Sequence, residues 1–223
     1  MRITEADNEI VTKAVAEAEL KTSGEIVTVV AQSSDGYTDV ALAIAAFLAF
    51  TKLVSMAFLS DVTIGIADTL TGGWNTEWTP AALFGIASAV GIATFLIVFA
   101  ILCIPAVRFA LIPGRVKTLR VEDAAIRHFK VGAERRTHGR TGVLIYVSLK
   151  EHRAQIVADE AIAAKVEPEV WGAAMVDMLQ EIKQGQLGAG IAAGVRDVGE
   201  ILAPHFPRAD DDQNELPDRL IQL

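Results

Sequence analysis

Three carboxylates are the residues of this sequence best suited to chemistry. Asp159 and Glu160 stand together where a β-branched segment ends, and Glu25 opens another such segment. Adjacent carboxylates at a strand end can bind Ca²⁺ or Mg²⁺ through oxygen, and a bound metal could hold a phosphate ester or activate water. The spacing is not specific, because a solvated acidic turn explains the same residues. A metal site with Asp159 as the candidate catalytic residue and a plain acidic turn both stay open.

No other group of residues has a recognised catalytic or metal-binding spacing. The sequence contains no GxGxxG, GxxxxGK or GxSxG segment, which removes the usual dinucleotide, P-loop and serine-hydrolase signals. The single cysteine, Cys103, can form no intrachain disulfide. The histidines show no HxH, HExxH or Cys-His spacing, so a zinc site has little support and we assign them structural or surface roles. They are His128, His138, His152 and His205.

Two long apolar stretches decide where any site can lie. The chain has 223 residues, of which 52% are hydrophobic. The stretch 40–60 contains one charge, Lys52, and the stretch 80–107 contains none. Each reaches the roughly 20 residues that a helix needs to cross a bilayer. The sequence therefore predicts two transmembrane helices, joined by a connector at 61–79.

The charges beside the predicted spans indicate an orientation. Segment 108–140 holds nine Lys or Arg residues against three acidic ones, whereas the connector 61–79 has acidic residues and no basic one. Basic segments next to a span usually stay in the cytoplasm. We therefore expect a multi-pass inner (cytoplasmic) membrane protein with its soluble domain and both termini in the cytoplasm. Residues 1–39 carry eight acidic and three basic residues, so we expect no cleaved leader.

The basic segment could contact lipid headgroups, form a solvated face or bind nucleic acid. The adjacent span makes lipid headgroups the nearest polyanion. We therefore expect anionic lipid as a partner and no nucleic acid. The residues that we assign to headgroup contact are Arg108, Arg115, Lys117 and Arg120.

Small residues recur at four-residue spacing in both predicted spans. Such spacing lets helix backbones approach closely in lipid, where dispersion forces hold helices together. A hairpin packed along both stripes is one hypothesis, and the alternatives are ordinary alanine-rich helices or contact with a partner's helix. Lys52 either faces a partner or a headgroup, or extends to the interface from a shifted span. The stripes are Ala41, Ala45 and Ala49 in the first span, and Ala81, Gly85, Ala89 and Ala93 in the second.

Three β-branched segments bounded by turn residues predict strands at 25–32, 141–149 and 153–158. The short connection between the last two predicts an antiparallel hairpin. Neither soluble piece of the chain can bury a strand alone. Strands 25–32 and 141–149 should therefore lie side by side, with the spans inserted in the crossover. Because the chain returns to the side that it left, an even number of spans is required.

Amphipathic segments predict helices around this sheet. In the first of them, Thr4 suits the N-cap position and Asp7 can return the hydrogen bond. The acidic tail 207–223 is either mobile or docks its late leucines on the domain or on a partner. The helices are expected at 4–21 and 115–136, from Pro168, and from about Leu187.

Several segments resemble the TPM domain family. They are a helix end and turn before a strand at 21–27 (KTSGEIV), a Gly-Val-Leu strand at 140–148 (RTGVLIYVS), and a strand that ends in an acidic loop at 156–160 (IVADE). The glycine spacing at 185–191 is also similar to that between the last two helices of the family. The resemblance covers essentially all of the soluble part, and the inserted spans with segment 214–218 look like a bacterial membrane-bound branch.

The resemblance implies a compact α/β sandwich with a central mixed sheet. The family includes bacterial membrane proteins, a plant thylakoid protein tied to photosystem II repair and an animal receptor auxiliary subunit. Some members are described as acid phosphatases and some as divalent-metal binders, and association with membrane protein complexes is their common property. Such a family predicts the fold better than the reaction, because fold alone does not determine function.

The sequence thus predicts a small TPM-like α/β sandwich with a mixed sheet, interrupted by a two-helix transmembrane hairpin. The domain is expected at 1–38 and 113–206, the hairpin at 39–112 and an acidic tail at 207–223. Our first hypothesis is a non-enzymatic, membrane-anchored accessory or assembly subunit of a membrane protein complex. The alternative is a metal-dependent, acid-type phosphatase at the cytoplasmic membrane face that uses Asp159 and Glu160, with Ca or Mg as the candidate metal.

Overall fold

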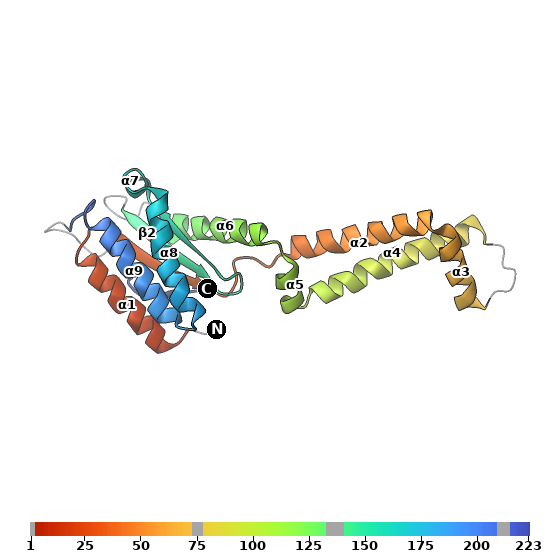
Figure 1. The fold of residues 1–223 in the computed structure, drawn as a ribbon, viewed down its shortest axis with the longest axis horizontal. Coiled ribbons are helices and arrows are strands. Elements are labelled where there is room, and N and C mark those ends of the chain that lie inside the picture. The colour runs from red at the N-terminus through yellow and green to blue at the C-terminus, as the bar shows by residue number, and fades with distance from the viewer. Residues whose placement is uncertain (1–2, 73–77, 133–140, 209–214) are drawn as a thin grey trace. The chain divides into compact units, whose positions relative to one another are not determined.

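The computed structural model describes residues 3–72, 78–132, 141–208 and 215–223 (Figure 1). The chain forms two compact units. We call them the sheet unit, built from Met1–Asp35 and Pro113–Leu223, and the hairpin unit, Gly36–Ile112. The two soluble pieces of the chain therefore combine, as the sequence predicts. His138 and the acidic residues at 210–212 lie outside the described residues.

The sheet unit contains a four-stranded mixed sheet with the order β3-β2-β1-β4. Strands β1 (Glu25–Ala31) and β2 (Gly142–Ser148) run parallel. Strand β3 (Arg153–Ala158) is antiparallel to β2, and the short β4 (Ile221–Gln222) is parallel to β1. The predicted neighbouring strands and the predicted antiparallel hairpin are confirmed, and the neighbouring pair is parallel. All residues of β1 and β2 are buried, because helices cover both faces of these central strands.

Helices cover the two faces of the sheet unequally (Figure 1). One face packs against α1, α8 and α9 in the larger core, where Val15, Ile145 and Val195 are completely buried. The other face packs against α6, through Val121 and Phe129. The helices are α1 (Glu5–Glu19), α6 (Gly114–Gly132), α7 (Glu160–Ala163), α8 (Pro168–Lys183) and α9 (Leu187–Leu202).

The start of α1 confirms the predicted capping box. The Thr4 hydroxyl accepts a hydrogen bond from the Asp7 backbone N–H at 3.1 Å, and the Thr4 backbone N–H donates to the Asp7 carboxylate at 2.9 Å. Val11, Ala14, Val15 and Ala18 form the buried stripe of this helix. Ile10 is exposed, because that stripe turns it away from the sheet.

The C-terminal segment belongs to the sheet unit rather than to a mobile tail. Leu216 is buried in the core under α6, and Leu220 in the core under α1. The Leu220 backbone N–H donates to the Asn8 side chain at 3.1 Å, directly before β4 pairs with β1. Mobility was therefore the wrong expectation for 215–223, where docking of the late leucines on the domain was the correct alternative.

The hairpin unit contains two helices that are long and apolar enough to span a membrane, α2 (Thr38–Phe58) and α4 (Pro80–Leu102). The predicted second span ends earlier than expected. Pro105 begins a separate helix, α5 (Pro105–Leu111), because proline has no N–H with which to continue a helix. An unexpected helix, α3 (Ser60–Thr71), follows α2.

The two predicted small-residue stripes differ in their burial. Ala41, Ala45 and Ala49 of α2 are buried. On α4, Gly91 makes the contact instead, since a Cβ added there would lie 3.1 Å from the Leu53 side chain. Glycine leaves the space that this leucine fills, so α4 turns its other stripe outward. The residues of that exposed stripe are Ala81, Gly85, Ala89 and Ala93.

Candidate functional site

The predicted acidic residues come to one edge of the sheet, where β1 and β2 begin and β3 ends. Glu25 lies opposite Gly142 in the pairing of β1 with β2. Asp159 directly follows Ala158, which pairs with Val143. Gly142 therefore lies between the two strand ends that carry these carboxylates.

Both buried carboxylates at this edge accept backbone hydrogen bonds. Asp159 accepts from the Gly142 N–H at 3.2 Å, and its own N–H donates to the Gly142 carbonyl at 2.9 Å. Glu25 accepts from the Leu216 N–H at 3.2 Å. One carboxylate therefore holds the end of β3 on β2, and the other holds the C-terminal segment on β1.

Glu160 differs from these two residues because it is exposed, as the first residue of α7. The Asp159 carbonyl accepts from the Ala163 N–H at 2.9 Å, so the acidic pair starts a short helix. Within the described parts of the chain, no three His, Cys, Asp or Glu side chains are grouped as a metal ion would need. The contacts of Asp159 and Glu25 give these residues structural roles, and a metal at this edge stays a prediction.

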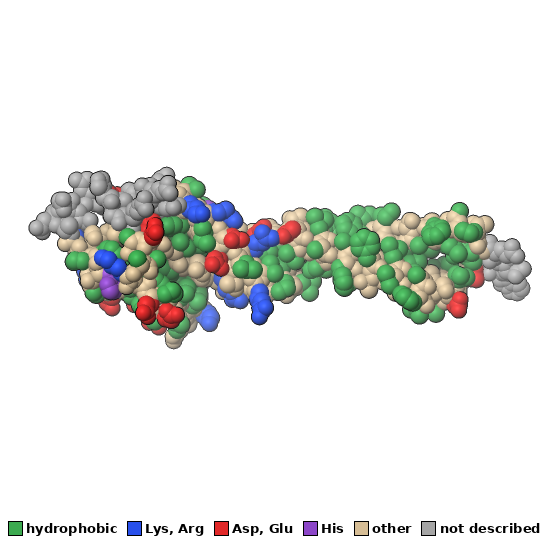
Figure 2. All heavy atoms as spheres, turned by 90° about the horizontal axis from the view of Figure 1, so that it is seen from above, with side chains coloured by type: hydrophobic (Ala, Val, Ile, Leu, Met, Phe, Trp, Pro, Cys, Tyr) green, Lys and Arg blue, Asp and Glu red, His purple; other side chains and the backbone are tan. Residues whose placement is uncertain are grey.

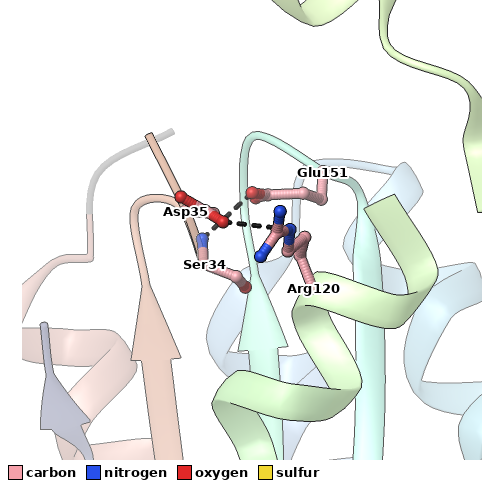
Figure 3. Close-up of polar contacts among 4 residues, drawn as sticks. All are labelled: Ser34, Asp35, Arg120 and Glu151. Atoms are coloured by element: carbon pink, nitrogen blue, oxygen red, sulfur yellow. Dashed lines mark hydrogen bonds and ion pairs between the residues drawn. The ribbon is translucent and has the colours of Figure 1, made fainter. Parts of the chain in front are cut away.

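A second polar cluster lies at the opposite edge, where the parallel strands β1 and β2 end (Figure 3). Its centre is Glu151, in the turn between β2 and β3, which is 2% exposed. One carboxylate oxygen of Glu151 accepts from the Ser34 backbone N–H at 3.0 Å, and the other accepts from the Ser148 hydroxyl. Because parallel strands end at the same edge, this one carboxylate joins the end of β1 to the end of β2.

An ion pair attaches α6 to the same edge. Arg120 of α6 lies 3.1 Å from the Asp35 carboxylate, and their side chains are 37% and 31% exposed. Figure 3 shows both residues beside Ser34 and Glu151. The sequence analysis assigned Arg120 to lipid headgroups, whereas here a carboxylate of the protein pairs with it. Arg115 is exposed on the same helix, so the headgroup prediction remains open for Arg115.

Two aromatic rings complete this cluster. The Tyr146 and Ser34 hydroxyls are 3.1 Å apart, and the His128 ring stacks on the Tyr146 ring with centroids 5.7 Å apart. Burial raises the pKa of the Tyr146 hydroxyl, with a smaller contribution in the same direction from the Glu151 charge. Burial, together with the charge of Arg127, lowers the pKa of His128 below its ordinary value. Both rings are therefore neutral at neutral pH.

We call this group the exit cluster, because the chain leaves the sheet unit after Asp35 and returns to it at Pro113. Glu151 is suited to holding geometry rather than to reacting, since it is buried and both its oxygens accept hydrogen bonds. Asp35 and Arg120 are charged residues of the cluster that are partly exposed. The members of the cluster are Ser34, Asp35, Arg120, His128, Tyr146, Ser148 and Glu151.

Most residues of the exit cluster could not be identified from the sequence. The available signals were a Ser-Asp pair directly after a predicted strand and a carboxylate in a tight turn. Neither signal predicts that these residues contact each other. Ser34 and Glu151 are 117 positions apart in the sequence, and the register of β1 on β2 brings them together.

Comparisons with known proteins agree with this architecture. A family model described as TPM domain matches residues 107–201. The chain is also similar to a solved structure, the NMR structure of the BA42 protein from the psychrophilic bacterium Bizionia argentinensis. The two chains are 18% identical with a TM-score of 0.57, over 100% of this chain and 97% of that one, a likeness that shows the fold. No curated protein matches significantly.

The family match covers the C-terminal part of the sheet unit, from α6 through β2, β3 and α8 to α9. The remaining elements, α1, β1 and β4, complete the same sheet and cores. The mixed sheet with helices on both faces is the fold that the family resemblance implies. The chain therefore contains a TPM domain, matched by its family model over residues 107–201.

Proposed function

We propose that this protein is a membrane-anchored interaction subunit, which holds its TPM domain at the cytoplasmic face of a membrane and binds a transmembrane helix of a partner complex. The observation that carries the proposal is the outward-facing small-residue stripe of α4. Its residues are Ala81, Gly85, Ala89 and Ala93.

The surface of the hairpin unit supports insertion into lipid. Large apolar side chains are exposed on both long helices, among them Phe47 and Phe50 on α2 and Phe84 on α4. Figure 2 shows hydrophobic side chains across the visible face of this unit. Water would make such a surface costly, whereas acyl chains cover it without penalty. The segments that follow supply cations for the cytoplasmic side, including Arg108, Arg115 and Lys117.

The α4 stripe adds a specific geometry to this apolar surface. Among the residues that the structure describes, a Cβ added at Gly85 would meet no heavy atom within 4 Å, so the backbone of α4 is open there. Exposed glycine and alanine at four-residue spacing let another helix come close enough for backbone contact, which bulky side chains prevent. Among the described residues of the hairpin unit, α2 packs around Gly91 and leaves this face open. A partner's helix is therefore the occupant that fits it.

The test is copurification of the tagged full-length chain in mild detergent, with any stoichiometric companion identified by mass spectrometry. Gly85→Leu places a bulky side chain in the middle of the stripe and should abolish retention of the companion. Ala43→Leu is the matched control, because Ala43 is an exposed small residue of α2 that lies on a different helix. It should retain the companion as the unsubstituted chain does.

Two outcomes would contradict the proposal. The first is a companion that Gly85→Leu retains as well as Ala43→Leu does, since the stripe would then not be the contact. The second is a chain that purifies alone from the native membrane under every mild condition. A solitary chain would direct attention to metal and phosphatase assays on Asp159.

A further inference from the structure

Helix α3 has an exposed apolar stripe along one side. Val62, Ile66 and Leu70 follow one another at four-residue spacing and are 57%, 57% and 82% exposed. At 100° per residue they fall on one face, and the two charged residues of the helix, Asp61 and Asp68, fall on the opposite face. The helix is therefore amphipathic, with its apolar side turned away from the rest of the described hairpin unit.

The position of α3 makes this stripe continuous with the apolar surface of α2. Leu59 is the C-cap residue of α2 and also the N-cap residue of α3. The side chains of Leu59 and Phe58 are both exposed. Figure 1 shows α3 turning away from the end of α2, across the long direction of the hairpin. A helix that crosses the direction of two spans at their end runs along the plane of the membrane surface rather than through it.

A tryptophan fixes which side of α3 faces outward. The Trp78 indole N–H donates to the Asp68 carboxylate at 2.7 Å, and Trp78 directly precedes Thr79, the N-cap of α4. The polar side of α3 is therefore tied to the start of the second long helix. Tryptophan at the end of a span is typical of the interface between acyl chains and headgroups, where its ring is apolar and its N–H finds a polar partner.

We propose that α3 is an interfacial helix, which inserts Val62, Ile66 and Leu70 among the acyl chains of the leaflet opposite the TPM domain. The proposal rests on the insertion of α2 and α4 under the proposed function. Lipid is the occupant that fits because the stripe continues the apolar surface of α2 and the charges are segregated on the other face. The helix has no Lys or Arg, so its insertion depends on apolar burial and needs no anionic headgroup.

The experiment measures collision of spin labels with oxygen, which concentrates in lipid, and with a water-soluble nickel chelate. The full-length chain with Cys103→Ser is reconstituted in vesicles of zwitterionic phosphatidylcholine and labelled at one new cysteine in each variant. Val62→Cys, Ile66→Cys and Leu70→Cys test the stripe. Ser60→Cys and Asp61→Cys are matched controls on the same helix, since both residues are exposed and lie off the stripe. Phe47→Cys marks the lipid-facing surface of α2.

We expect the ratio of oxygen to nickel collisions to be several-fold higher at the three stripe positions than at Ser60 and Asp61. Nickel access at the stripe with a lipid-protected Phe47 would overturn this inference and leave the proposed insertion of the hairpin intact. Exclusion of both reagents from the stripe would also overturn it, because protein would then cover the helix. Nickel access at Phe47 would overturn both proposals.

Discussion

Glu151 and Ser34 are joined by a hydrogen bond of 3.0 Å from the Ser34 backbone N–H to the Glu151 carboxylate. The second oxygen of the same carboxylate accepts from the Ser148 hydroxyl. Replacing the Glu151 side chain should cost folding free energy, because the Ser34 N–H and the Ser148 hydroxyl would both lose their hydrogen-bond acceptor. The end of β1, the end of β2 and the following turn therefore depend on one side chain.

Glu151→Ala should lower the free energy of unfolding by about 2–3 kcal/mol, since it leaves a backbone N–H and a hydroxyl unpaired in a buried place. Chemical unfolding of the full-length chain in detergent, followed by circular dichroism, measures the change. Glu160→Ala is the matched control, because Glu160 is exposed, and it should change stability by less than about 0.5 kcal/mol. Equal effects of the two substitutions would contradict the role of Glu151.

Asp159→Ala should lower the free energy of unfolding by about 1–2 kcal/mol, because the Gly142 N–H loses its carboxylate acceptor. If the role of Asp159 is structural, millimolar Ca²⁺ or Mg²⁺ should not change the unfolding midpoint of the unsubstituted chain. A rise in that midpoint on adding the metal, lost in Asp159→Asn with the fold intact, would instead support the metal site. Phosphomonoester hydrolysis lost in the same variant would support the phosphatase.

Gly190→Ala should lower the free energy of unfolding by about 1–3 kcal/mol. A Cβ at Gly190 of α9 would lie 2.7 Å from the Met178 backbone carbonyl of α8, so backbone would have to move. Gly172→Ala in α8 is the matched control, since a Cβ there would meet nothing within 4 Å. That control should raise stability by roughly 0.5–1 kcal/mol, because alanine favours a helix over glycine. Loss of stability in both variants would contradict the packing.

The ionised Asp7 carboxylate should stabilise the folded domain at neutral pH, and this contribution should be lost in acid. Burial raises the pKa of Asp7, but hydrogen bonds from Thr4 and Gly188 outweigh it and lower the pKa below its ordinary value. A carboxyl with a lowered folded pKa contributes stability above its unfolded pKa and loses it as the pH falls through the folded value. Unfolding midpoints measured from neutral to acidic pH should fall less steeply in Asp7→Asn. An unchanged slope would contradict this, and Glu9→Gln, at an exposed position, is the control.

The Asp197 carboxylate should destabilise the folded domain at neutral pH, which is the opposite of the effect of Asp7. Burial, followed by the charges of Asp177 and Glu200, raises the pKa of Asp197. One of its oxygens is buried and has no hydrogen-bond partner among the residues that the structure describes. The folded state then binds a proton more readily than the unfolded chain, so the ionised carboxylate opposes folding until the pH falls below the raised pKa. Asp197→Asn should raise the unfolding midpoint at neutral pH, with a gain that shrinks in acid. A lower midpoint at neutral pH would contradict this reasoning.

The parts of the fold that depend on local pattern could be predicted from the sequence. The bounds of β3 and the capping box of Thr4 with Asp7 follow from β-branched runs and from a short-range exchange of hydrogen bonds. The pairing of β1 with β2 followed from a topological argument, since neither soluble piece could bury its strand alone. These predictions depended only on residues close together in the sequence, or on the expectation that both soluble pieces lie on the same side of a membrane.

The parts that depend on distant contacts could not be predicted. Strand β4 has two residues, too few for any alternation, and it forms because Leu216 and Leu220 are buried on either side of the sheet. The spacing of small residues in α4 indicated a face for close packing but not its occupant, and Gly91 decided which face meets α2. The exit cluster needed the register of β1 on β2, which no local signal contains.

The insertion of the hairpin unit between β1 and β2 determines the order of events during synthesis. Strand β1 leaves the ribosome well before β2, and its neighbours on both sides, β2 and β4, are encoded after the hairpin. An apolar strand with both edges unpaired is prone to aggregate. On the proposed membrane insertion of α2 and α4, the hairpin unit would enter the bilayer before the sheet closes, and the maturation of the sheet unit would then depend on the membrane insertion machinery as well as on its own sequence.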